Sequence, residues 1–474
     1  MARAKTPQDP GQLQGLVLRR GRGSPLYVQL ADAVERAIED GQVVPGDRLP
    51  RHHDLASDLD VNITTVTKAF AILKGKGLVD SKPGRGTVVR PMGRRAKYPF
   101  QTVPADRRDV VDLSVNRPAT NLYLSSLAKL LPELAADERF VGIADYQAAD
   151  GPRWARSAAA TWISEFGPSV DPQQVLITGG AQHALAATMS AFGRVGDTVL
   201  ADNVTYQGIN ALCRVRNLEL RGVPGDEEGM SPDALDAACA DRSARILFLV
   251  PSLHNPTTTT LSEQRRQALV DVARRHGLLV VEDDVYAPLL ETRPPSIATL
   301  YSERTIYVSG LSKCVAPGLR AGFLAAPHAL VPELAAAIRI DCWSMSPLTS
   351  LIATKLIGSG KAAAIVEAQR AELMERNRIT RDALRGLDLA SQDTSTHAWL
   401  SLPAPWRGNN FAAACEQYGV RVLAAEAFTL GHAPAPHAVR LNLAAARTHE
   451  DLAEGLKVLR KVLDLRHLHA HSFV

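Results

Sequence analysis

A lysine and an arginine stand seven residues apart in a polar segment that follows an apolar, strand-like run. The segment reads Ser-Gly-Leu-Ser-Lys-Cys-Val-Ala-Pro-Gly-Leu-Arg from Ser309 to Arg320. A lysine amine held just after a strand can form a Schiff base with an aldehyde, and a nearby guanidinium suits a phosphate group. We therefore predict Lys313 as the covalent, catalytic lysine of a site and Arg320 as a phosphate ligand.

Further polar residues follow other apolar runs. Asp283 follows the apolar run Leu278 to Glu282 directly. A carboxylate buried at this position needs a cationic partner, such as a protonated pyridine nitrogen. Tyr286 and Asn255 each carry a donor that suits a phenolate oxygen. By itself, Asp283 would be read as a helix cap or a surface acid. The bond between Asn255 and Pro256 is a candidate for a cis peptide.

A glycine pair stands between a predicted strand and a predicted helix in the segment Ile177 to Gln182. Free backbone amides and the helix dipole bind anions at such a turn, so Gly180, Ala181 and Gln182 are predicted to hold a phosphate. Tyr206, after the next strand, can stack on a planar ring. Each feature is weak alone, because ordinary turns use glycine and most tyrosines are structural. Together, the lysine, carboxylate, donors, ring and anion cup are what pyridoxal 5'-phosphate requires.

A separate group of residues near the N-terminus could contact double-stranded DNA. Short helices are predicted over Asp54 to Leu59 and over Ile63 to Lys74 with a tight turn between them, which is typical of a helix-turn-helix. Small polar side chains at the start of the second helix can reach base edges, and a lysine one turn later can reach a phosphate. The residues predicted for these contacts are Asn62, Thr64, Thr65, Thr67 and Lys68. By spacing alone, a structural three-helix unit would fit equally well.

A two-stranded wing is predicted directly after these helices. Leu78 to Ser81 and Thr87 to Val89 read as strands around a turn with Lys82 and Arg85 at its tip. These cations would lie along the DNA backbone or a minor groove, and salt would weaken their contacts. Residues 1–110 hold 19 lysines and arginines against 12 acidic residues, although the whole chain carries a net charge of only +4. This asymmetry suits a polyanion partner, but a mildly basic surface would look the same.

The apolar periodicity predicts how these groups are positioned. A DNA-binding domain is expected over residues 20–90, a proline- and arginine-containing linker over 91–109, and a large domain over 110–474. In the large domain, β-rich runs alternate with helical stretches, which predicts an α/β fold with a mostly parallel sheet. Strands are expected at Val175 to Thr178, Thr198 to Ala201, Arg245 to Val250, Leu278 to Glu282 and Thr305 to Ser309. Helices are expected at Gln182 to Phe192, Ser262 to His276, Val331 to Ile340 and Lys361 to Leu387.

Composition excludes several classes of protein. Apolar residues make up 46% and charged residues 22%, which is ordinary for a globular chain. No apolar run approaches the roughly 20 residues that span a bilayer, and the N-terminus lacks the apolar core of a signal peptide. The five cysteines are scattered, so we expect them to be reduced, buried and without a metal. These features predict a cytoplasmic protein that does not bind membranes.

The N-terminal motifs together resemble the winged helix-turn-helix domain of the GntR family of regulators. They run from Pro-Leu-Tyr-x-Gln-Leu through Pro-Gly-Asp-x-Leu-Pro, Thr-Thr-Val-x-x-Ala-Phe and Gly-Leu-Val to Pro-Gly-x-Gly-Thr-x-Val over residues 25–90. By this resemblance, Thr64, Thr65 and the wing face DNA. Two positions depart from the pattern, since His53 and Ile63 stand where the family usually has arginine. These departures bear on affinity and on operator sequence.

The rest of the chain, Val110 to Val474, resembles fold type I aminotransferases, particularly the group of kynurenine and aminoadipate aminotransferases. The resemblance implies a mostly parallel sheet with helices on both faces and a smaller C-terminal α+β part. It assigns ring stacking to Tyr206, the phenolate to Asn255 and Tyr286, the pyridinium nitrogen to Asp283, and the phosphate loop to Gly180, Ala181 and Gln182.

The same resemblance assigns roles to residues that spacing alone does not single out. Tyr146 is similar to a tyrosine that reaches the phosphate of the partner subunit, and Arg440 to the arginine that forks a substrate α-carboxylate. Asn116 is expected near that carboxyl group. Gly310 stands where the family usually has a serine or threonine on the phosphate, so Ser309 or Ser312 is expected to compensate.

A GntR-like head on an aminotransferase-like body is the arrangement of the MocR subfamily of transcription regulators. This resemblance implies a head-to-tail homodimer that binds DNA and senses an amino acid, an amine or pyridoxal phosphate through exchange at the lysine. One alternative is a working aminotransferase that converts an amino acid and a 2-oxo acid. Another is a sensor of the cofactor alone. The sequence does not identify the effector or the operator.

Overall fold

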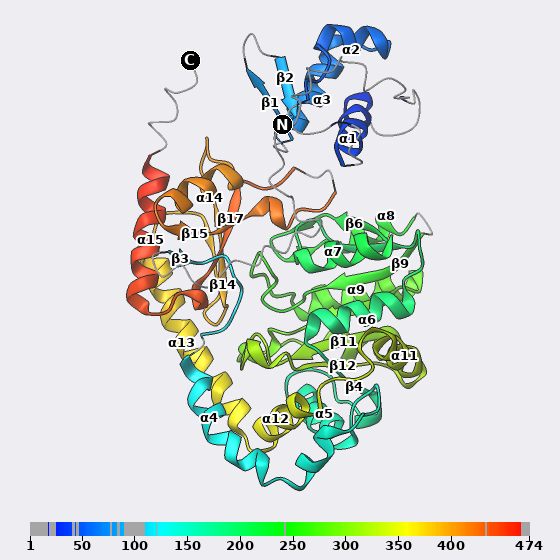
Figure 1. Cartoon of the computed structure of the whole chain (residues 1–474), viewed down its shortest axis with the longest axis vertical. Helices are drawn as coiled ribbons and strands as arrows, with labels where there is room; N and C mark the ends of the chain where they lie inside the picture. The colour runs from blue at the N-terminus through cyan, green and yellow to red at the C-terminus, as the bar shows by residue number, and fades with distance from the viewer. Residues whose placement is uncertain are drawn as a thin grey trace, which may run out of the picture. The chain divides into compact units, whose positions relative to one another are not determined.

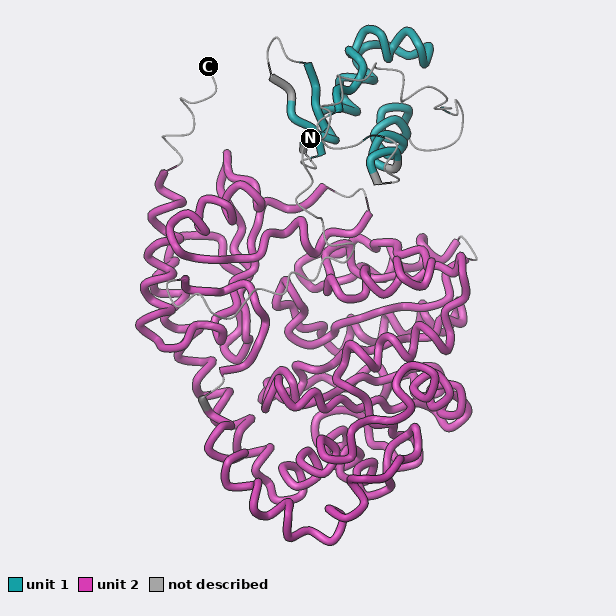
Figure 2. The backbone as a smooth tube through the Cα atoms, in the orientation of Figure 1, with its two compact units in different colours: residues 1–99 teal, residues 100–474 magenta. Residues whose placement is uncertain are grey.

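The computed structural model describes most of the chain, in ten stretches. They are residues 18, 25–39, 43, 47–75, 78–82, 86–89, 110–119, 121–240, 243–431 and 434–465. The chain divides into two compact units, Met1–Pro99 and Phe100–Val474, which are coloured separately in Figure 2 and are described one at a time below. The predicted linker over residues 91–109 lies outside the described residues, as does Arg85 of the predicted wing.

The first unit is a winged helix-turn-helix, as the sequence predicts. Its elements are α1 (Leu26–Glu39), α2 (His52–Asp58), α3 (Ile63–Gly75), β1 (Val79–Lys82) and β2 (Gly86–Val89). The two strands pair antiparallel with Val79 opposite Val89. A small apolar core forms where Leu30, Leu55 and Phe70 of the three helices meet. This core leaves the first turn of α3 exposed.

The second unit is built around a seven-stranded sheet in the order β4-β12-β11-β10-β9-β5-β6 (Figure 1). These strands are β4 (Val175–Thr178), β12 (Gly322–Ala325), β11 (Thr305–Gly310), β10 (Leu279–Asp283), β9 (Ala244–Leu249), β5 (Thr198–Asp202) and β6 (Glu219–Val223). Only β12 runs antiparallel to its neighbours, so the predicted mostly parallel sheet is confirmed. The five predicted strands all form, with ends that differ by one residue at most.

Helices connect the strands of the second unit and cover its sheets. The helices are α4 (Asn121–Ala135), α5 (Arg153–Phe166), α6 (Ala181–Phe192), α7 (Gln207–Arg216), α8 (Pro232–Ala238), α9 (Glu263–His276), α10 (Ile297–Leu300), α11 (Val331–Cys342), α12 (Pro347–Gly358), α13 (Lys361–Ala383), α14 (Gly408–Gln417) and α15 (His449–Asp464). A separate hairpin pairs β7 (Gly225–Asp226) with β8 (Gly229–Met230). The helix predicted to reach Leu387 ends at Ala383, because the chain turns there into the C-terminal part.

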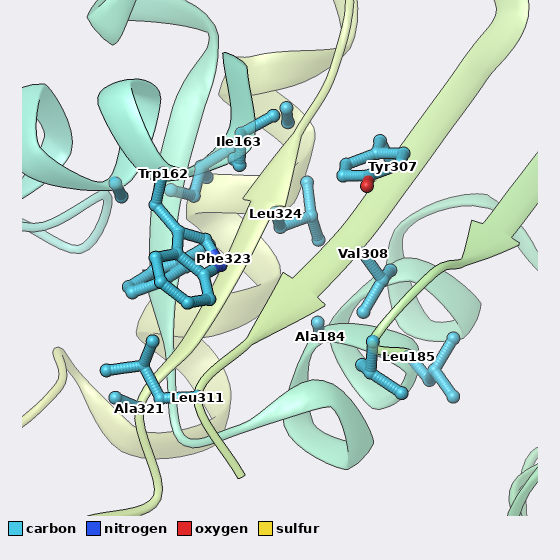
Figure 3. Close-up of a cluster of buried hydrophobic side chains, with 14 of the residues drawn as sticks. Trp162, Ile163, Ala184, Leu185, Tyr307, Val308, Leu311, Ala321, Phe323 and Leu324 are labelled. Carbon is cyan, nitrogen blue, oxygen red and sulfur yellow. The ribbon is translucent and has the colours of Figure 1, made fainter. Parts of the chain in front are cut away.

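Apolar side chains fill the space between the sheet and its helices. Figure 3 shows Trp162 of α5 beside Phe323 of β12, whereas the next residue, Leu324, points to the other face of the sheet. Ala184 and Leu185 of α6 belong to the same buried cluster. Strands β4, β10 and β11 are buried along their whole length, which explains why they read as apolar runs; β12 is equally buried but is not among the predicted strands.

The C-terminal part has its own sheet and core. It consists of a four-stranded sheet in the order β13-β14-β17-β16, covered by α14 and α15, with the long helix α13 leading into it (Figure 1). Its strands are β13 (Leu389–Ala390), β14 (His397–Ser401), β16 (Leu423–Ala424) and β17 (Ala438–Asn442). A separate parallel pair joins β3 (Val111–Asp112) to β15 (Val420–Arg421). The first strand of the unit is therefore attached to its C-terminal part.

Two further findings concern the exclusions made from composition. None of the helices in the residues that the structure describes has the length and apolar character to span a bilayer. All five cysteines are free, but the expectation that all are buried is wrong for Cys342, which is exposed at the last position of α11. It is exposed because the helix ends there and Trp343 turns away from it with a φ of +67°.

Candidate functional site

Most of the predicted cofactor residues meet at one edge of the seven-stranded sheet. Asp283 is the last residue of β10, and Lys313 comes three residues after the end of β11. The carboxyl ends of parallel strands lie at the same edge, so loops from distant parts of the sequence converge there. Asn255 and Tyr206 follow β9 and β5 at this edge.

The amine of Lys313 is held by a backbone group. Its Nζ donates a hydrogen bond of 2.7 Å to the carbonyl oxygen of Asn116. Burial lowers the pKa of Lys313 to about 8, and the positive charge of Arg440 adds to this, whereas Asp283 opposes it. A lowered pKa leaves more of the amine neutral near pH 7, which is the form that attacks an aldehyde.

Asp283 has an unused oxygen in a buried position. Its Oδ1 makes no hydrogen bond within the described part of the chain, and the residue is only 5% exposed. Burial raises the pKa of Asp283 to about 7, and the charge of Lys313 opposes this. A protonated ring nitrogen would satisfy the orphaned oxygen and hold the carboxylate ionised. This donor set therefore fits the pyridine ring of the cofactor.

Asn116 links Tyr286, one of the two predicted phenolate ligands, to Lys313. Its Nδ2 donates to the hydroxyl of Tyr286 at 2.8 Å, while its carbonyl accepts from Lys313. Asn255 accepts from Nη1 of Arg440 at 2.8 Å, so its Nδ2 is left to donate elsewhere. The bond between Asn255 and Pro256 is cis, as predicted.

The predicted phosphate cup is formed by the turn before α6 and by Arg320. Gly180 is the N-cap of α6 and has a φ of +90°, which favours glycine. Nη2 of Arg320 donates to the carbonyl of Gly179 at 3.1 Å, and a Cβ on Gly180 would lie 2.7 Å from that nitrogen. Ser312 Oγ is buried and has no partner among the described residues. These donors fit a phosphate group.

Two further cofactor predictions concern Gln182 and Gly310. Oε1 of Gln182 accepts from the hydroxyl of Tyr206 at 2.9 Å, which fixes the orientation of that ring at the start of α7. Gly310 ends β11, and a Cβ there would lie 2.8 Å from the carbonyl oxygen of Ala321. Close packing of the strands therefore favours glycine at position 310, and Ser312 offers the hydroxyl instead of Ser309, which is buried within β11.

Arg440 lies on β17 and is only 3% exposed. Its guanidinium donates to Asn255 and to the carbonyl of Ser114, and it lies 4.9 Å from the ring centre of Phe428. Burial lowers the pKa of Arg440 to about 10, and Tyr286 and Tyr206 oppose this. These direct partners are all uncharged, so a carboxylate would be a much stronger ligand.

Tyr146 is joined to the other predicted cofactor residues by no hydrogen bond or ring contact in the described part of the chain. It follows a 3-10 helix (Glu138–Ala144), is 83% exposed, and has a ring contact with Trp343 at 5.7 Å. Its predicted role toward a partner subunit therefore stays a prediction.

Sequence reasoning missed several groups that position the site. Thr396 and Asn442 both donate to Oδ1 of Asn116, at 3.0 and 2.9 Å. Asn442 carries a readable signal, since it stands two residues after Arg440 on one strand and so shares its face. The contact between the Ser114 carbonyl and Arg440 has no signal in the sequence, because a backbone carbonyl exists at every position.

The candidate DNA interface is the exposed start of α3. Oδ1 of Asn62 accepts from both the backbone N–H and the hydroxyl of Thr64 at 2.9 Å, so Asn62 caps the helix. The hydroxyl of Thr67 donates to the carbonyl of Ile63 at 2.9 Å, and Nζ of Lys68 lies 5.6 Å from the ring centre of Tyr27. The exposed positions of this face are Asn62, Ile63, Thr64, Thr67 and Lys68, with Thr65 half-buried.

The remaining DNA-contact predictions fall partly beyond what the structure describes. Lys82 is the last residue of β1, and Arg85 lies outside the described residues. His53 is exposed in the first turn of α2. Its neighbour His52 stacks on Phe70 with ring centres 4.7 Å apart, which fixes α2 against α3.

Comparison with known proteins identifies both units. Residues 108–459 match the family of class I and II aminotransferases, and residues 26–89 match the gntR family of bacterial regulatory proteins. Because the first match covers most of the chain, the chain belongs to the family of class I and II aminotransferases. It joins that domain to a GntR-type helix-turn-helix domain, which is the arrangement of MocR-type regulators.

Individual relatives agree with this assignment. The chain is 29% identical over 440 residues to the HTH-type transcriptional regulator YdeF of Bacillus subtilis, covering 93% of this chain and 95% of YdeF. It is 32% identical over 231 residues to 2-aminoadipate transaminase of Thermus thermophilus, covering 47% of this chain and 57% of that enzyme. The solved structure of LysN, the α-aminoadipate aminotransferase of Thermus thermophilus, superposes with a TM-score of 0.70 at 25% identity over 76% of this chain and 94% of LysN.

These relationships also identify the cofactor. The structure of LysN contains N-(5'-phosphopyridoxyl)-L-leucine, and the site of this chain offers the lysine, carboxylate and anion cup that such a group needs. Pyridoxal 5'-phosphate is the cofactor of this protein's large domain.

Proposed function

We propose that this protein is a cytoplasmic transcription regulator whose binding to operator DNA responds to an amino acid or amine bound at the pyridoxal phosphate site. The observation that carries the proposal is the buried guanidinium of Arg440, which lies in the same site as Lys313 and has only uncharged direct partners. Such a group suits the carboxylate of an incoming amino acid. The chain also carries a DNA-binding helix-turn-helix, so ligand binding can change operator affinity.

Each residue of the site has a defined task in this proposal. Bound pyridoxal phosphate supplies an aldehyde that reacts reversibly with primary amines. Lys313 provides the amine that a ligand must replace, and Asp283 holds a proton on the ring nitrogen. Arg440 orients the ligand through its carboxylate. The cup retains the phosphate through Gly180, Ala181, Gln182, Ser312 and Arg320.

The segment that follows the linker supplies a route for coupling. The carbonyls of Ser114 and Asn116 contact Arg440 and Lys313, which are the two groups that a ligand would engage. A bound carboxylate competes with the carbonyl of Ser114 for Arg440. Release of this carbonyl shifts the segment, and β3 at residues 111–112 transmits the shift to the preceding linker.

The proposed active form is a head-to-tail homodimer in which Tyr146 of one protomer contacts the phosphate bound by its partner. The exposed rings of Tyr146 and Trp343, which contact each other, support this arrangement, because aromatic residues are enriched in protein–protein interfaces. In such a dimer two DNA-binding units can read two half-sites.

The test is a titration of operator DNA with the full-length protein loaded with cofactor, in the presence of a panel of amino acids and the corresponding amines. We expect at least one ligand to change operator affinity in the wild type and to have no effect in Lys313→Ala. The matched control is Lys361→Ala, which removes a surface lysine paired with Glu133 and should respond as the wild type does. Equal affinities for all ligands in the wild type would refute ligand sensing.

A second candidate function is that of an aminotransferase. It is favoured because Lys313, Asp283 and Arg440 converge at one site. They supply the lysine, the carboxylate and the arginine that transamination requires. Conversion of the bound cofactor by an amino donor, followed by its recovery with a 2-oxo acid over many cycles, would establish an enzyme. A response of operator affinity to the cofactor alone would instead favour a sensor of pyridoxal phosphate.

A further inference from the structure

We propose that His183 is a positioning residue for the phosphate cup and that its uncharged ring is required for the cup to bind the phosphate of the cofactor. His183 lies in the first turn of α6, three residues after Gly180. None of the roles derived above involves its side chain.

The contact that defines this role is made to the backbone of the cup. The N–H of Gly179 donates to Nδ1 of His183 at 2.9 Å, and the carbonyl of the same residue accepts from Arg320 at 3.1 Å. The backbone of Gly179 is therefore held on both sides by side chains. Gly180 comes next, and its φ of +90° directs the following amides of α6 toward the anion.

The contact works only with one protonation state of the ring. A backbone N–H can only donate, so Nδ1 must offer its lone pair, and the remaining ring proton must lie on Nε2. Nε2 faces Oδ2 of Asp341 at 3.3 Å, which favours that tautomer. Asp341 belongs to α11, so this helix orients the ring and the ring orients the cup.

The surroundings of His183 favour the neutral ring over the charged one. The side chain is 13% exposed, and burial lowers the pKa of His183, whereas Asp341 opposes this. The other groups that face this site are the thiol of Cys342, 3.8 Å from Nε2, and the guanidinium of Arg320 on the far side of Gly179. Met345, which lies beside Gly179, carries no charge.

Protonation of Nδ1 would place two N–H groups against each other. The N–H of Gly179 would then lose its acceptor, and the turn before α6 would have to rotate or leave a buried donor unpaired. We therefore expect the cup to lose affinity for phosphate as the pH falls through the pKa of His183. Binding of the pyridine ring and the aldehyde does not depend on this contact.

The experiment compares pyridoxal 5'-phosphate with pyridoxal, which lacks the phosphate, as probes for the full-length protein. Dissociation constants of both are measured by equilibrium dialysis from about pH 8 to about pH 5.5, the range in which histidine titrates. The ratio of the two constants isolates the cup, because effects on Lys313 and Asp283 influence both probes. The variants are His183→Asn, which keeps an acceptor near the position of Nδ1 but cannot titrate, and His183→Ala, which removes it.

In the wild type we expect acid to reduce the preference for the phosphorylated probe about tenfold more than in His183→Asn, as for the loss of one hydrogen bond. The ionisation of the phosphate itself contributes equally to both. His183→Ala should show a reduced preference at every pH. Identical pH profiles for the wild type and His183→Asn would overturn the proposal.

Two further variants keep the proposal testable if His183→Asn does not fold. Asp341→Asn removes the charge that favours protonation of the ring, so the acid loss of preference should move to lower pH. Cys342→Ser, on the same helix, should leave the profile where it is in the wild type. An unchanged profile in Asp341→Asn would contradict the assignment. Far-UV circular dichroism across the pH range verifies that each protein stays folded.

Discussion

The amine of Lys313 donates a hydrogen bond to the backbone carbonyl of Asn116, although the two residues are 197 positions apart in the sequence. The same asparagine receives hydrogen bonds from Thr396 and Asn442 of the C-terminal part. The lysine is thus connected to both parts of the large domain by one residue. Any ligand that displaces Lys313 from this carbonyl also removes one of the contacts that hold the segment after the linker.

Replacement of Lys313 should abolish covalent attachment of the cofactor. In Lys313→Ala, we expect no visible absorption band from a lysine adduct and an affinity for pyridoxal phosphate at least about tenfold lower, since the contacts of the cup and Asp283 remain. Absorption spectra and equilibrium dialysis measure the two effects. A Lys313→Ala protein with the spectrum and affinity of the wild type would show that another lysine is used.

Arg440→Lys should weaken binding of ligands that carry a carboxylate. Lysine cannot form the forked pair of hydrogen bonds, so we expect a loss of about 2 kcal/mol, or roughly 30-fold in affinity, for an amino acid. The corresponding amine, which lacks the carboxylate, should lose little. Spectral titration of the loaded protein gives both affinities. Arg265→Lys is the matched control, because Arg265 pairs with Asp226 and Glu228 and contacts none of the residues of the site.

Gly180→Ala should damage the phosphate cup. The φ of +90° is strained for alanine, and the new methyl group would lie 2.7 Å from Arg320 Nη2. We expect a loss of stability of about 1 to 2 kcal/mol together with weaker binding of pyridoxal phosphate. Gly277→Ala is the control, since Gly277 at the end of α9 also has a positive φ, +63°, but its methyl group would meet no atom within 4 Å. Equal affinities of the two variants would contradict the structure of the cup.

The buried histidines should each lower the stability of the large domain in mild acid, although buried carboxyls such as Asp283, whose pKa burial raises to about 7, act in the opposite direction. Burial, followed by the charge of Arg440, lowers the pKa of His397 to about 3, and burial lowers that of His254 to about 4. Below about pH 6.5 these histidines bind protons in the unfolded chain but stay neutral in the folded chain. Their contribution to the free energy of unfolding therefore decreases as the pH falls. Urea denaturation at neutral pH and at about pH 4.5 should show a difference of about 2 to 3 kcal/mol from His397 alone.

The variant His397→Gln separates this contribution from other acid effects. Relative to the wild type, the change in its stability between neutral pH and about pH 4.5 should be more favourable by this amount, since glutamine does not titrate. His328→Gln, at the protein surface, serves as the comparison and should leave the acid dependence of the wild type in place. An unchanged acid dependence in His397→Gln would show that other groups dominate.

Lys68→Ala should weaken DNA binding in a manner that depends on salt. If Lys68 contacts a phosphate, its removal reduces the slope of log affinity against log salt by about 0.9 and affects all sequences alike. Fluorescence anisotropy with mixed-sequence duplex DNA measures this slope. Lys74→Ala, in the last turn of α3, is the control and should keep the slope of the wild type. No change in Lys68→Ala would exclude this contact.

Much of the site could be predicted because its chemistry depends on residue types at the ends of apolar runs. Asp283, Asn255 and Tyr206 each follow a strand that reads as a continuous apolar segment, and parallel strands bring their ends to one edge. The helix-turn-helix was predictable because its apolar spacing and turn residues are local. Roles at the cup and at the DNA interface stay predictions until they are measured.

Other features depend on groups that sequence patterns do not distinguish. The carbonyls of Ser114 and Asn116 contact Arg440 and Lys313, but a carbonyl is present at every position. Similarly, resemblance predicts that Tyr146 acts at the phosphate, whereas its ring contact in a single chain is with Trp343.

The amino-acid sequence by itself determined the two kinds of chemistry, because a lysine, a carboxylate and an anion cup after strands, and a capped polar helix start, are properties of residue type and spacing. Only the tertiary structure decided which partner each of these groups has. The ring of His183 against Gly179, the oxygen of Asp283 without a partner and the guanidinium of Arg440 among uncharged groups all depend on how distant segments pack. Packing sets these contacts because burial removes water and leaves each polar group only the neighbours that the fold provides.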